Sequence, residues 1–123
     1  MHPVVLVAIG GSMGAVARWG IGEVLATDSE SGMPWATLLV NLLGSFALGM
    51  LLGGAVGTGI GERWVLLIGV GLLGSFTTMS TFSMELVQMV DRGAVGLASL
   101  HLLLNLLAPV MAWFGWMLTG ASG

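Results

Sequence analysis

Residues 74–83 read GSFTTMSTFS and lie in the middle of an otherwise apolar segment, residues 64–90. Six of these ten side chains carry a hydroxyl group, and Gly69 and Gly71 just upstream weaken a helix further. Irregular backbone at membrane depth is tolerated only where it is buried in protein or lines a cavity. The stretch therefore predicts a membrane helix that breaks near residues 74–78. Its freed carbonyls would suit a small cation, and the half-helix that follows would offer amide donors to an anion.

Outward from this stretch, the chain divides into four apolar runs. They cover residues 4–26, 34–56, 64–90 and 94–118, with polar or glycine-rich breaks at 27–33, 56–63 and 91–93. Each run is longer than the roughly 20 residues that a helix needs to cross about 30 Å of hydrocarbon. Short alternating segments typical of a membrane β-barrel are absent from the sequence. We predict an all-α membrane protein, with one four-helix transmembrane domain over residues 1–123 and a broken third helix.

The composition supports a membrane protein and excludes several other classes. Of 123 residues, 56% are hydrophobic and 7% are charged, with six acids, three arginines and no lysine. An ordinary soluble domain has roughly 25% charged residues. A soluble enzyme, a disordered chain and a nucleic-acid-binding domain are therefore all disfavoured. With no cysteine and two scattered histidines, neither a disulfide framework nor a zinc cluster is expected.

The arginines give almost no orientation signal. Arg63 lies on the side of the N-terminus, whereas Arg92 lies on the other side, together with Arg18 if Arg18 reaches the end of the first helix. The positive-inside rule thus has little bias to act on. This balance is consistent with a chain that inserts in both orientations and forms an inverted dimer, and equally with a fixed topology set by other factors.

Several further polar residues lie inside the apolar runs. Hydroxyl groups in membrane helices usually bond back to the preceding turn, but six in nine positions beside Glu85 favour a permeation route. Asn41, midway through the second run, is either interhelical glue or a donor in a pore. His101 and Asn105 share one helical face, where a packing contact is favoured over a proton relay. Pro109 predicts a kink in the fourth helix.

Three motifs together resemble the Fluc (CrcB) family of fluoride channels. They are GGSMGAVAR at residues 10–18, TLLVN at 37–41 followed by GSF at 44–46, and the stretch from residue 74 that continues to residue 85. The resemblance implies a passive fluoride-selective channel that exports fluoride across the bacterial inner membrane. It also implies an antiparallel dual-topology dimer with two narrow pores and a structural Na⁺ at the dimer centre.

The same resemblance assigns roles to individual residues. It implies Na⁺ coordination by the main-chain carbonyls of Gly74 and Thr77. It places Arg18 in the vestibule and makes Glu85 the acid that follows the motif. The pore-lining positions that it implies are Asn41, Met79, Ser80, Thr81 and Phe82. The sequence departs from the family where Met79 replaces the first of two phenylalanines. In a loose alignment, Ala108 and Ala112 replace fourth-helix hydroxyl residues. A thioether lacks the partial positive edge of a ring, which implies one impaired pore, or a partner that is a homologous subunit rather than a second copy.

Two other functions remain as alternatives. A small dual-topology, proton-coupled multidrug antiporter would need a membrane-embedded acid in the first helix, where Arg18 is the embedded charge and Glu23 lies near the end. A non-conducting partner subunit is consistent with Met79 and the two alanines. An enzyme is not expected, because no nucleophile–base pair is evident in the sequence.

Overall fold

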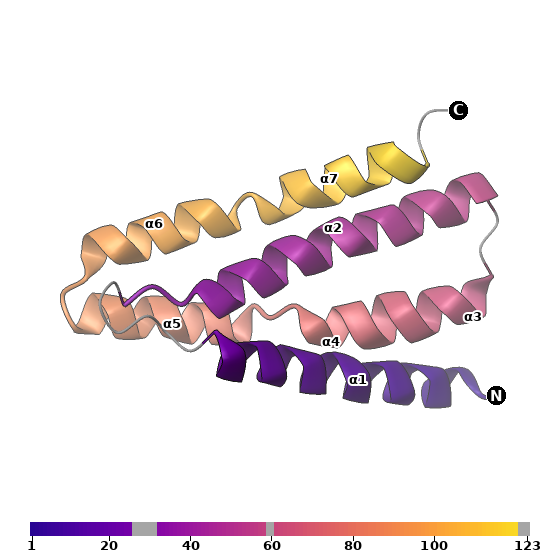
Figure 1. Cartoon of the computed structure of the whole chain (residues 1–123), viewed down its shortest axis with the longest axis horizontal. Helices are drawn as coiled ribbons and strands as arrows, with labels where there is room; N and C mark the ends of the chain where they lie inside the picture. The colour runs from indigo at the N-terminus through magenta and orange to yellow at the C-terminus, as the bar shows by residue number, and fades with distance from the viewer. Residues whose placement is uncertain (26–31, 59–60, 121–123) are drawn as a thin grey trace.

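The computed structural model of this chain describes residues 1–25, 32–58 and 61–120, and Figure 1 shows their arrangement. Within these residues, four helical segments are long and apolar enough to cross a membrane: Pro3–Val24, Trp35–Ala55, Glu62–Asp91 and Val95–Thr119. No strand occurs in the described ranges. The prediction of an all-α protein with four membrane-spanning segments is confirmed. Residues 27–31 and 59–60, which belong to two of the predicted breaks, lie outside the described residues.

The third and fourth segments are each divided into shorter elements. In chain order the elements are α1 (Pro3–Val24), α2 (Trp35–Thr58), α3 (Glu62–Trp64), the π-helical segment η1 (Val65–Leu73), α4 (Gly74–Phe76), α5 (Ser80–Asp91), α6 (Val95–Asn105) and α7 (Ala108–Thr119). In Figure 1, α2 runs between the α6–α7 segment and the α3–α5 segment, and α1 lies along the outer side of the third segment. The most extensive contacts join α2 to α7 and α1 to η1.

Glycines make these two helix contacts close. A Cβ on Gly14 of α1 would collide with the backbone carbonyl of Leu72 in η1. A Cβ on Gly49 of α2 would collide with the carbonyl of Ala112 in α7. Small residues let membrane helices approach backbone to backbone, so these two glycines serve helix packing.

The break that the sequence predicts near residues 74–78 of the third helix is present. Gly74 keeps helical torsions (φ −62°, ψ −35°), and α4 ends at Phe76. Thr77 is extended (φ −78°, ψ 153°), and α5 begins at Ser80. The chain leaves the helix where a side chain of α2 binds the next amide, so a tertiary contact and not the glycine sets the position of the break.

The fourth segment is also interrupted, as Pro109 predicts. Helix α6 ends at Asn105 and α7 begins at Ala108. The amide of Leu107 donates to the carbonyl of Leu104, 3.1 Å away, in a tighter turn than an α-helix has. Proline has no N–H, so it cannot donate to the Asn105 carbonyl four residues earlier. The interruption lies level with the third-helix break, and both adjoin the same cavity.

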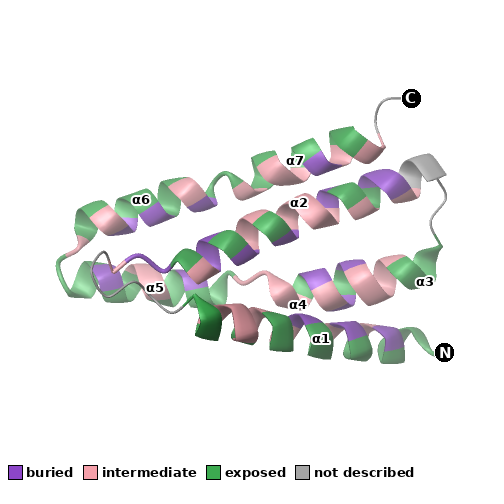
Figure 2. Ribbon diagram, viewed as in Figure 1, coloured by how far each residue is buried: buried purple, intermediate pink, exposed green. Residues whose placement is uncertain are grey.

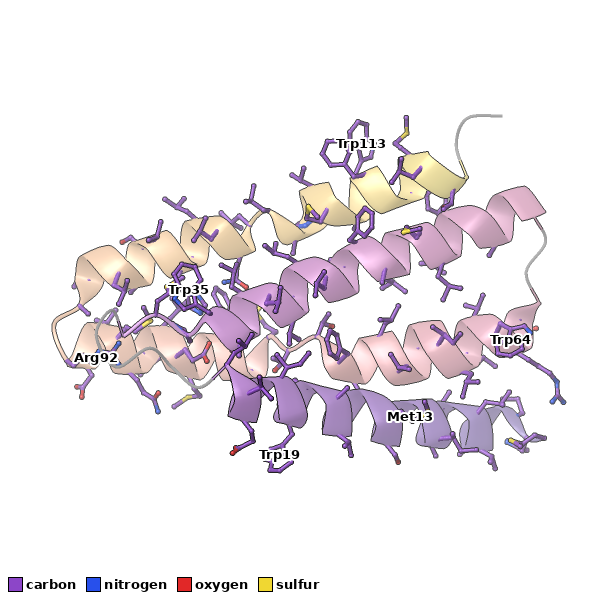
Figure 3. All side chains as sticks on the ribbon, viewed as in Figure 1. Met13, Trp19, Trp35, Trp64, Arg92 and Trp113 are labelled. Atoms are coloured by element: carbon purple, nitrogen blue, oxygen red, sulfur yellow. The ribbon has the colours of Figure 1, made fainter. Side chains whose placement is uncertain are left out.

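The side chains are arranged with apolar groups outside and several polar groups inside. Figure 2 shows exposed residues along the outer faces of α1, α6 and α7. The buried residues include Thr37, His101 and Asn105, which is unusual for a protein surrounded by water. Figure 3 shows Trp64 near one end of the bundle, and Trp35 and Arg92 near the other. This distribution is that of a multi-pass membrane protein with tryptophans near both interfaces.

Candidate functional site

The centre of the site is the contact between Asn41 of α2 and the break in the third segment. The backbone amide of Thr78 donates to Asn41 Oδ1 at 2.9 Å, and Asn41 Nδ2 donates to the Thr78 carbonyl at 3.2 Å. Asn41 thus satisfies both backbone groups of a residue that the broken helix leaves without its usual partners. Nδ2 also donates to Asn105 Oδ1 at 3.0 Å. Asn41 therefore serves as interhelical glue, and it does so at the point where the helix opens.

A cavity of about 300 Å³ lies on one side of this contact. Its lining includes Asn41, Thr77, Thr78, Met79, Phe82 and Asn105. The structure therefore brings together three of the pore-lining residues inferred from the resemblance, namely Asn41, Met79 and Phe82. Met79 lies at the outer edge with 72% of its surface exposed, whereas Phe82 is buried.

A second cavity, of about 280 Å³, lies on the other side of the break. Its lining includes Arg18, Glu23, Thr37, Thr78, Thr81 and Glu85. Thr78 contributes to both cavities, so the break and its bond to Asn41 stand between them. Within the described part of the chain, no ion pair joins Arg18 to either acid. Arg18 is thus a cation placed beside a cavity.

A continuous set of hydrogen bonds links the two cavities through the protein interior. Thr37 Oγ1 donates to Glu85 Oε2 at 2.8 Å, and Glu85 Oε1 lies 3.1 Å from His101 Nε2. His101 Nδ1 lies 3.1 Å from Asn105 Nδ2, and Asn105 in turn meets Asn41. No buried side-chain nitrogen or oxygen in the described residues lacks a partner. The polar groups inside the bundle thus form one satisfied network from α2 through α5 and α6 back to α2.

The hydroxyl groups of the motif have different roles. Those of Thr77 and Ser83 bond back to the carbonyls of Leu73 (3.2 Å) and Met79 (2.8 Å). Thr78 Oγ1 caps α5 by accepting from the Thr81 amide at 3.2 Å. Only part of the cluster is thus free to line a permeation route. Since the helix is broken, Thr77 does not share a helical face with Ser80 and Thr81, contrary to what an unbroken helix predicts.

Carbonyl groups are the candidates for binding a cation here. Among the described residues, no group of three or more His, Cys, Asp or Glu side chains is placed to hold a metal ion. In a continuous helix, the amides of Thr78 and Thr81 would donate to the carbonyls of Gly74 and Thr77. Here those amides donate to Asn41 Oδ1 and to Thr78 Oγ1 instead. The two carbonyls named by the resemblance are thus among those in the break that lose their usual helical donor, which fits a Na⁺ site built from main-chain oxygens.

Sequence analysis missed one residue of this network. It identified Asn41 and Glu85 but not Thr37, although Thr37 lies one helical turn before Asn41 on the same face of α2. It placed His101 and Asn105 on one face and favoured a packing contact, and the structure shows them buried and hydrogen-bonded to each other. Their contacts with Glu85 and Asn41 are between helices, and one sequence carries no signal for such pairs.

An interrupted polar helix that passes between two cavities, inside a small four-span bundle, defines a membrane protein of the channel and transporter class. Residues 5–116 match the family described as "CrcB-like protein, Camphor Resistance (CrcB)", and the chain belongs to this family.

Curated relatives are similar over most of their length. The protein named "Fluoride-specific ion channel FluC" from Erythrobacter litoralis is 43% identical over 120 residues, covering 92% of this chain and 88% of the relative. A protein of the same name from Idiomarina loihiensis is 42% identical over 112 residues, covering 91% and 87%. Another from Thermus thermophilus is 38% identical over 122 residues, covering 98% of both chains. These relatives are named as channels and not as enzymes.

Proposed function

We propose that this chain forms a passive, fluoride-selective channel that exports fluoride across the bacterial cell membrane and so lowers its toxicity in the cytoplasm. The observation that carries the proposal is the break at Thr78, held open by Asn41 between two cavities. The names of the relatives supply the identity of the ion. A channel and not an enzyme is the function that both lines of support favour.

A small anion needs donors that replace its water, and the site supplies them without a ring of cations. Thr81 and Ser80 are exposed hydroxyl residues at the start of α5, and Thr81 lines the cavity that holds Arg18. The Phe82 ring lines the other cavity, where a ring edge carries partial positive charge. Selectivity from neutral donors is compatible with the formal net charge of −3.

We further infer that the working unit is an antiparallel dimer, of two copies or of this chain with a homologue. Gly74, Ser80 and Thr81 are exposed at the break, which lies in the middle of a membrane-spanning segment. Polar side chains and irregular backbone are costly against lipid, so a protein surface is expected to cover them. Two inverted copies would bring two sets of Gly74 and Thr77 carbonyls together, which supports a shared Na⁺ site at their contact.

The test is fluoride efflux from liposomes that contain only this purified chain, followed with a fluoride electrode. We expect fluoride to leave when potassium ionophore balances the charge, and chloride to be retained. Absence of efflux from an intact dimer would favour a non-conducting partner subunit. Drug uptake driven by a proton gradient would instead support the antiporter. That alternative is weakened by α1, whose embedded charge is Arg18 and whose acid, Glu23, lies close to the helix end.

The side chain at position 79 is predicted to affect the rate of fluoride efflux. Met79→Phe is expected to raise fluoride efflux about fivefold, because a ring edge beside the cavity replaces a thioether and contributes on the order of 1 kcal/mol. Met84→Phe is the matched control, since Met84 is an exposed methionine of α5, the helix that follows Met79, and does not line this cavity. Equal efflux from Met79→Phe and the unmodified chain would show that position 79 does not limit the pore.

A further inference from the structure

His101 is the most deeply buried polar side chain of the network, with an exposed fraction of 0% inside the fourth membrane-spanning segment. Its ring packs edge-on against Phe82, with 5.0 Å between the ring centroids. His101 lines neither of the two cavities beside the break. It therefore does not touch an ion in either cavity, and its ring nitrogens act on other protein groups.

The neighbours of His101 determine which ring nitrogen donates and which accepts. Nε2 lies 3.1 Å from Glu85 Oε1, and a carboxylate accepts hydrogen bonds. The other carboxylate oxygen, Oε2, already accepts from the Thr37 hydroxyl at 2.8 Å. Nδ1 lies 3.1 Å from Asn105 Nδ2, and an amide NH₂ group only donates. Nε2 therefore donates to Glu85, and Nδ1 accepts from Asn105.

His101 thereby engages both hydrogens of the Asn105 NH₂ group. Asn105 Nδ2 donates to the His101 carbonyl at 2.8 Å and to the ring Nδ1 at 3.1 Å. The amide oxygen of Asn105 is left to face Asn41, and it accepts from Asn41 Nδ2 at 3.0 Å. The two ends of an amide have nearly the same shape, so the donors and acceptors around it decide its orientation. The acceptors of His101 thus keep the oxygen of Asn105 toward Asn41.

The orientation of Asn105 is passed on to Asn41 and to the break. One hydrogen of Asn41 Nδ2 is held by Asn105 Oδ1, so this nitrogen stays on the side of Asn105. Asn41 Oδ1 then remains the atom that accepts from the Thr78 amide at 2.9 Å. A reversed Asn41 amide would place its NH₂ group against the Thr78 N–H, and neither donor would have an acceptor. A chain of hydrogen bonds thus connects the His101 ring to the Thr78 backbone.

We propose that His101 is a positioning residue, which accepts at Nδ1, orients the Asn105 amide and so holds Asn41 against the backbone of Thr78. Glu85 keeps the ring hydrogen on Nε2, which leaves Nδ1 free to accept. The effect of His101 on fluoride flux rests on the proposed channel function. Its effect on the Thr78 amide does not, so the two can be tested separately.

The first test is His101→Phe, which keeps a ring beside Phe82 and removes both nitrogens. Asn105 then lacks one of its acceptors, and Asn41 is held less firmly. We expect hydrogen exchange of the Thr78 amide to become about tenfold faster and fluoride efflux about tenfold slower, because an unsatisfied buried donor has an effect of this size. Exchange is followed by NMR of the purified protein in detergent, and efflux is measured from liposomes with a fluoride electrode.

His101→Asn separates positioning from the filling of space. Its side-chain oxygen is bonded to Cγ as Nδ1 is, so it can accept from Asn105, although the side chain is too short to reach Glu85. We expect this variant to recover most of the efflux and of the Thr78 protection that His101→Phe loses. A role limited to filling space predicts the reverse order, since phenylalanine fills the site better than asparagine does.

A double variant tests whether His101 acts through Asn105. Asn105→Leu alone should slow efflux and should expose the Thr78 amide, because Asn41 loses its acceptor. Adding His101→Phe to Asn105→Leu should cause little further change, since the two residues belong to one chain of contacts. Losses that simply add in the double variant would contradict the proposal.

His2→Phe is the matched control, because the chain has two histidines and His2 lies at the start of α1, where it accepts from the Val4 amide. Efflux and Thr78 exchange should not change in this variant. It also leaves a single imidazole, whose ¹⁵N NMR spectrum near neutral pH should show the hydrogen on Nε2.

Two results would overturn the positioning role of His101. One is a ring hydrogen on Nδ1, and the other is unchanged Thr78 exchange in a folded His101→Phe protein. Absence of fluoride efflux from the unmodified chain, with the differences in Thr78 exchange intact, would instead contradict the proposed channel function and leave the positioning role in place.

Discussion

Asn41→Leu is expected to abolish fluoride efflux, with a loss of about a hundredfold or more. The substitution removes the acceptor for the Thr78 amide and the donor to the Thr78 carbonyl, and it also removes the bond to Asn105. Leaving a buried polar group unsatisfied costs about 1–3 kcal/mol each, and every 1.4 kcal/mol is about a tenfold change. Leucine has a similar volume, so the main change is the loss of polar contacts where the third helix opens. The measurement is efflux from liposomes with equal amounts of incorporated protein.

Ser45→Ala is the matched control for this prediction. Ser45 lies one turn further along α2 and lines the same cavity, but no hydrogen bond from its side chain supports the break. We expect efflux within about threefold of the unmodified chain, since an unbonded hydroxyl contributes well under 1 kcal/mol here. Similar losses in both variants would mean that the cavity wall tolerates no change at all. In that case the effect of Asn41→Leu would not report on the Asn41–Thr78 contact.

Asn41 also illustrates how far sequence analysis reaches. An amide in the middle of an apolar run must find partners, so its importance could be predicted from position alone. Whether it acted as glue or as a pore donor could not, because the answer depends on Thr78 and Asn105, which lie 37 and 64 residues away. The structure shows the structural role directly, and it shows that the Asn41 amide donates to two protein acceptors, the Thr78 carbonyl and Asn105 Oδ1.

The broken third helix shows a similar limit. The density of hydroxyl groups and the preceding glycines predicted an interruption, and the structure has one. The break was predicted near residues 74–78; within that range Gly74 stays helical and the chain opens at Thr77. The position of the break is set by the two hydrogen bonds between the Asn41 side chain and the Thr78 backbone. These bonds leave neither the amide nor the carbonyl of Thr78 without a partner. The π-helical turn of η1 just before it was not predicted, because wide turns have no simple sequence pattern.

The predictions about membrane orientation and about a partner subunit depend on the membrane and on other chains, and they remain predictions. Balanced arginines on the two sides suit insertion in both orientations, and the exposed break suits a covering partner. Met79, Ala108 and Ala112 bear on whether that partner is a second copy. The four spans, by contrast, follow from length and hydropathy alone, which is why they could be predicted within a few residues at each end.

Gly14→Leu is expected to prevent formation of the native bundle. A Cβ at position 14 would overlap the carbonyl of Leu72 and lie about 2.9 Å from its carbonyl carbon, so backbone and not a flexible side chain is in the way. Helices α1 and η1 would have to separate, which would loosen the segment that leads into the break. Forcing bulk into such a contact costs at least about 3 kcal/mol, a large part of the 5–15 kcal/mol that typically stabilises a domain.

The comparison that isolates this contact is Gly20→Leu, on the same helix. No heavy atom within 4 Å would meet a Cβ at Gly20. Both substitutions replace glycine by a good helix former, so their effects on the isolated helix are equal and only the packing differs. We expect Gly20→Leu to elute in detergent as a single species like the unmodified chain, and Gly14→Leu to aggregate or fail to accumulate. A well-folded Gly14→Leu protein with normal efflux would mean that the bundle does not need the close approach of α1 to η1. It would contradict the packing role of Gly14.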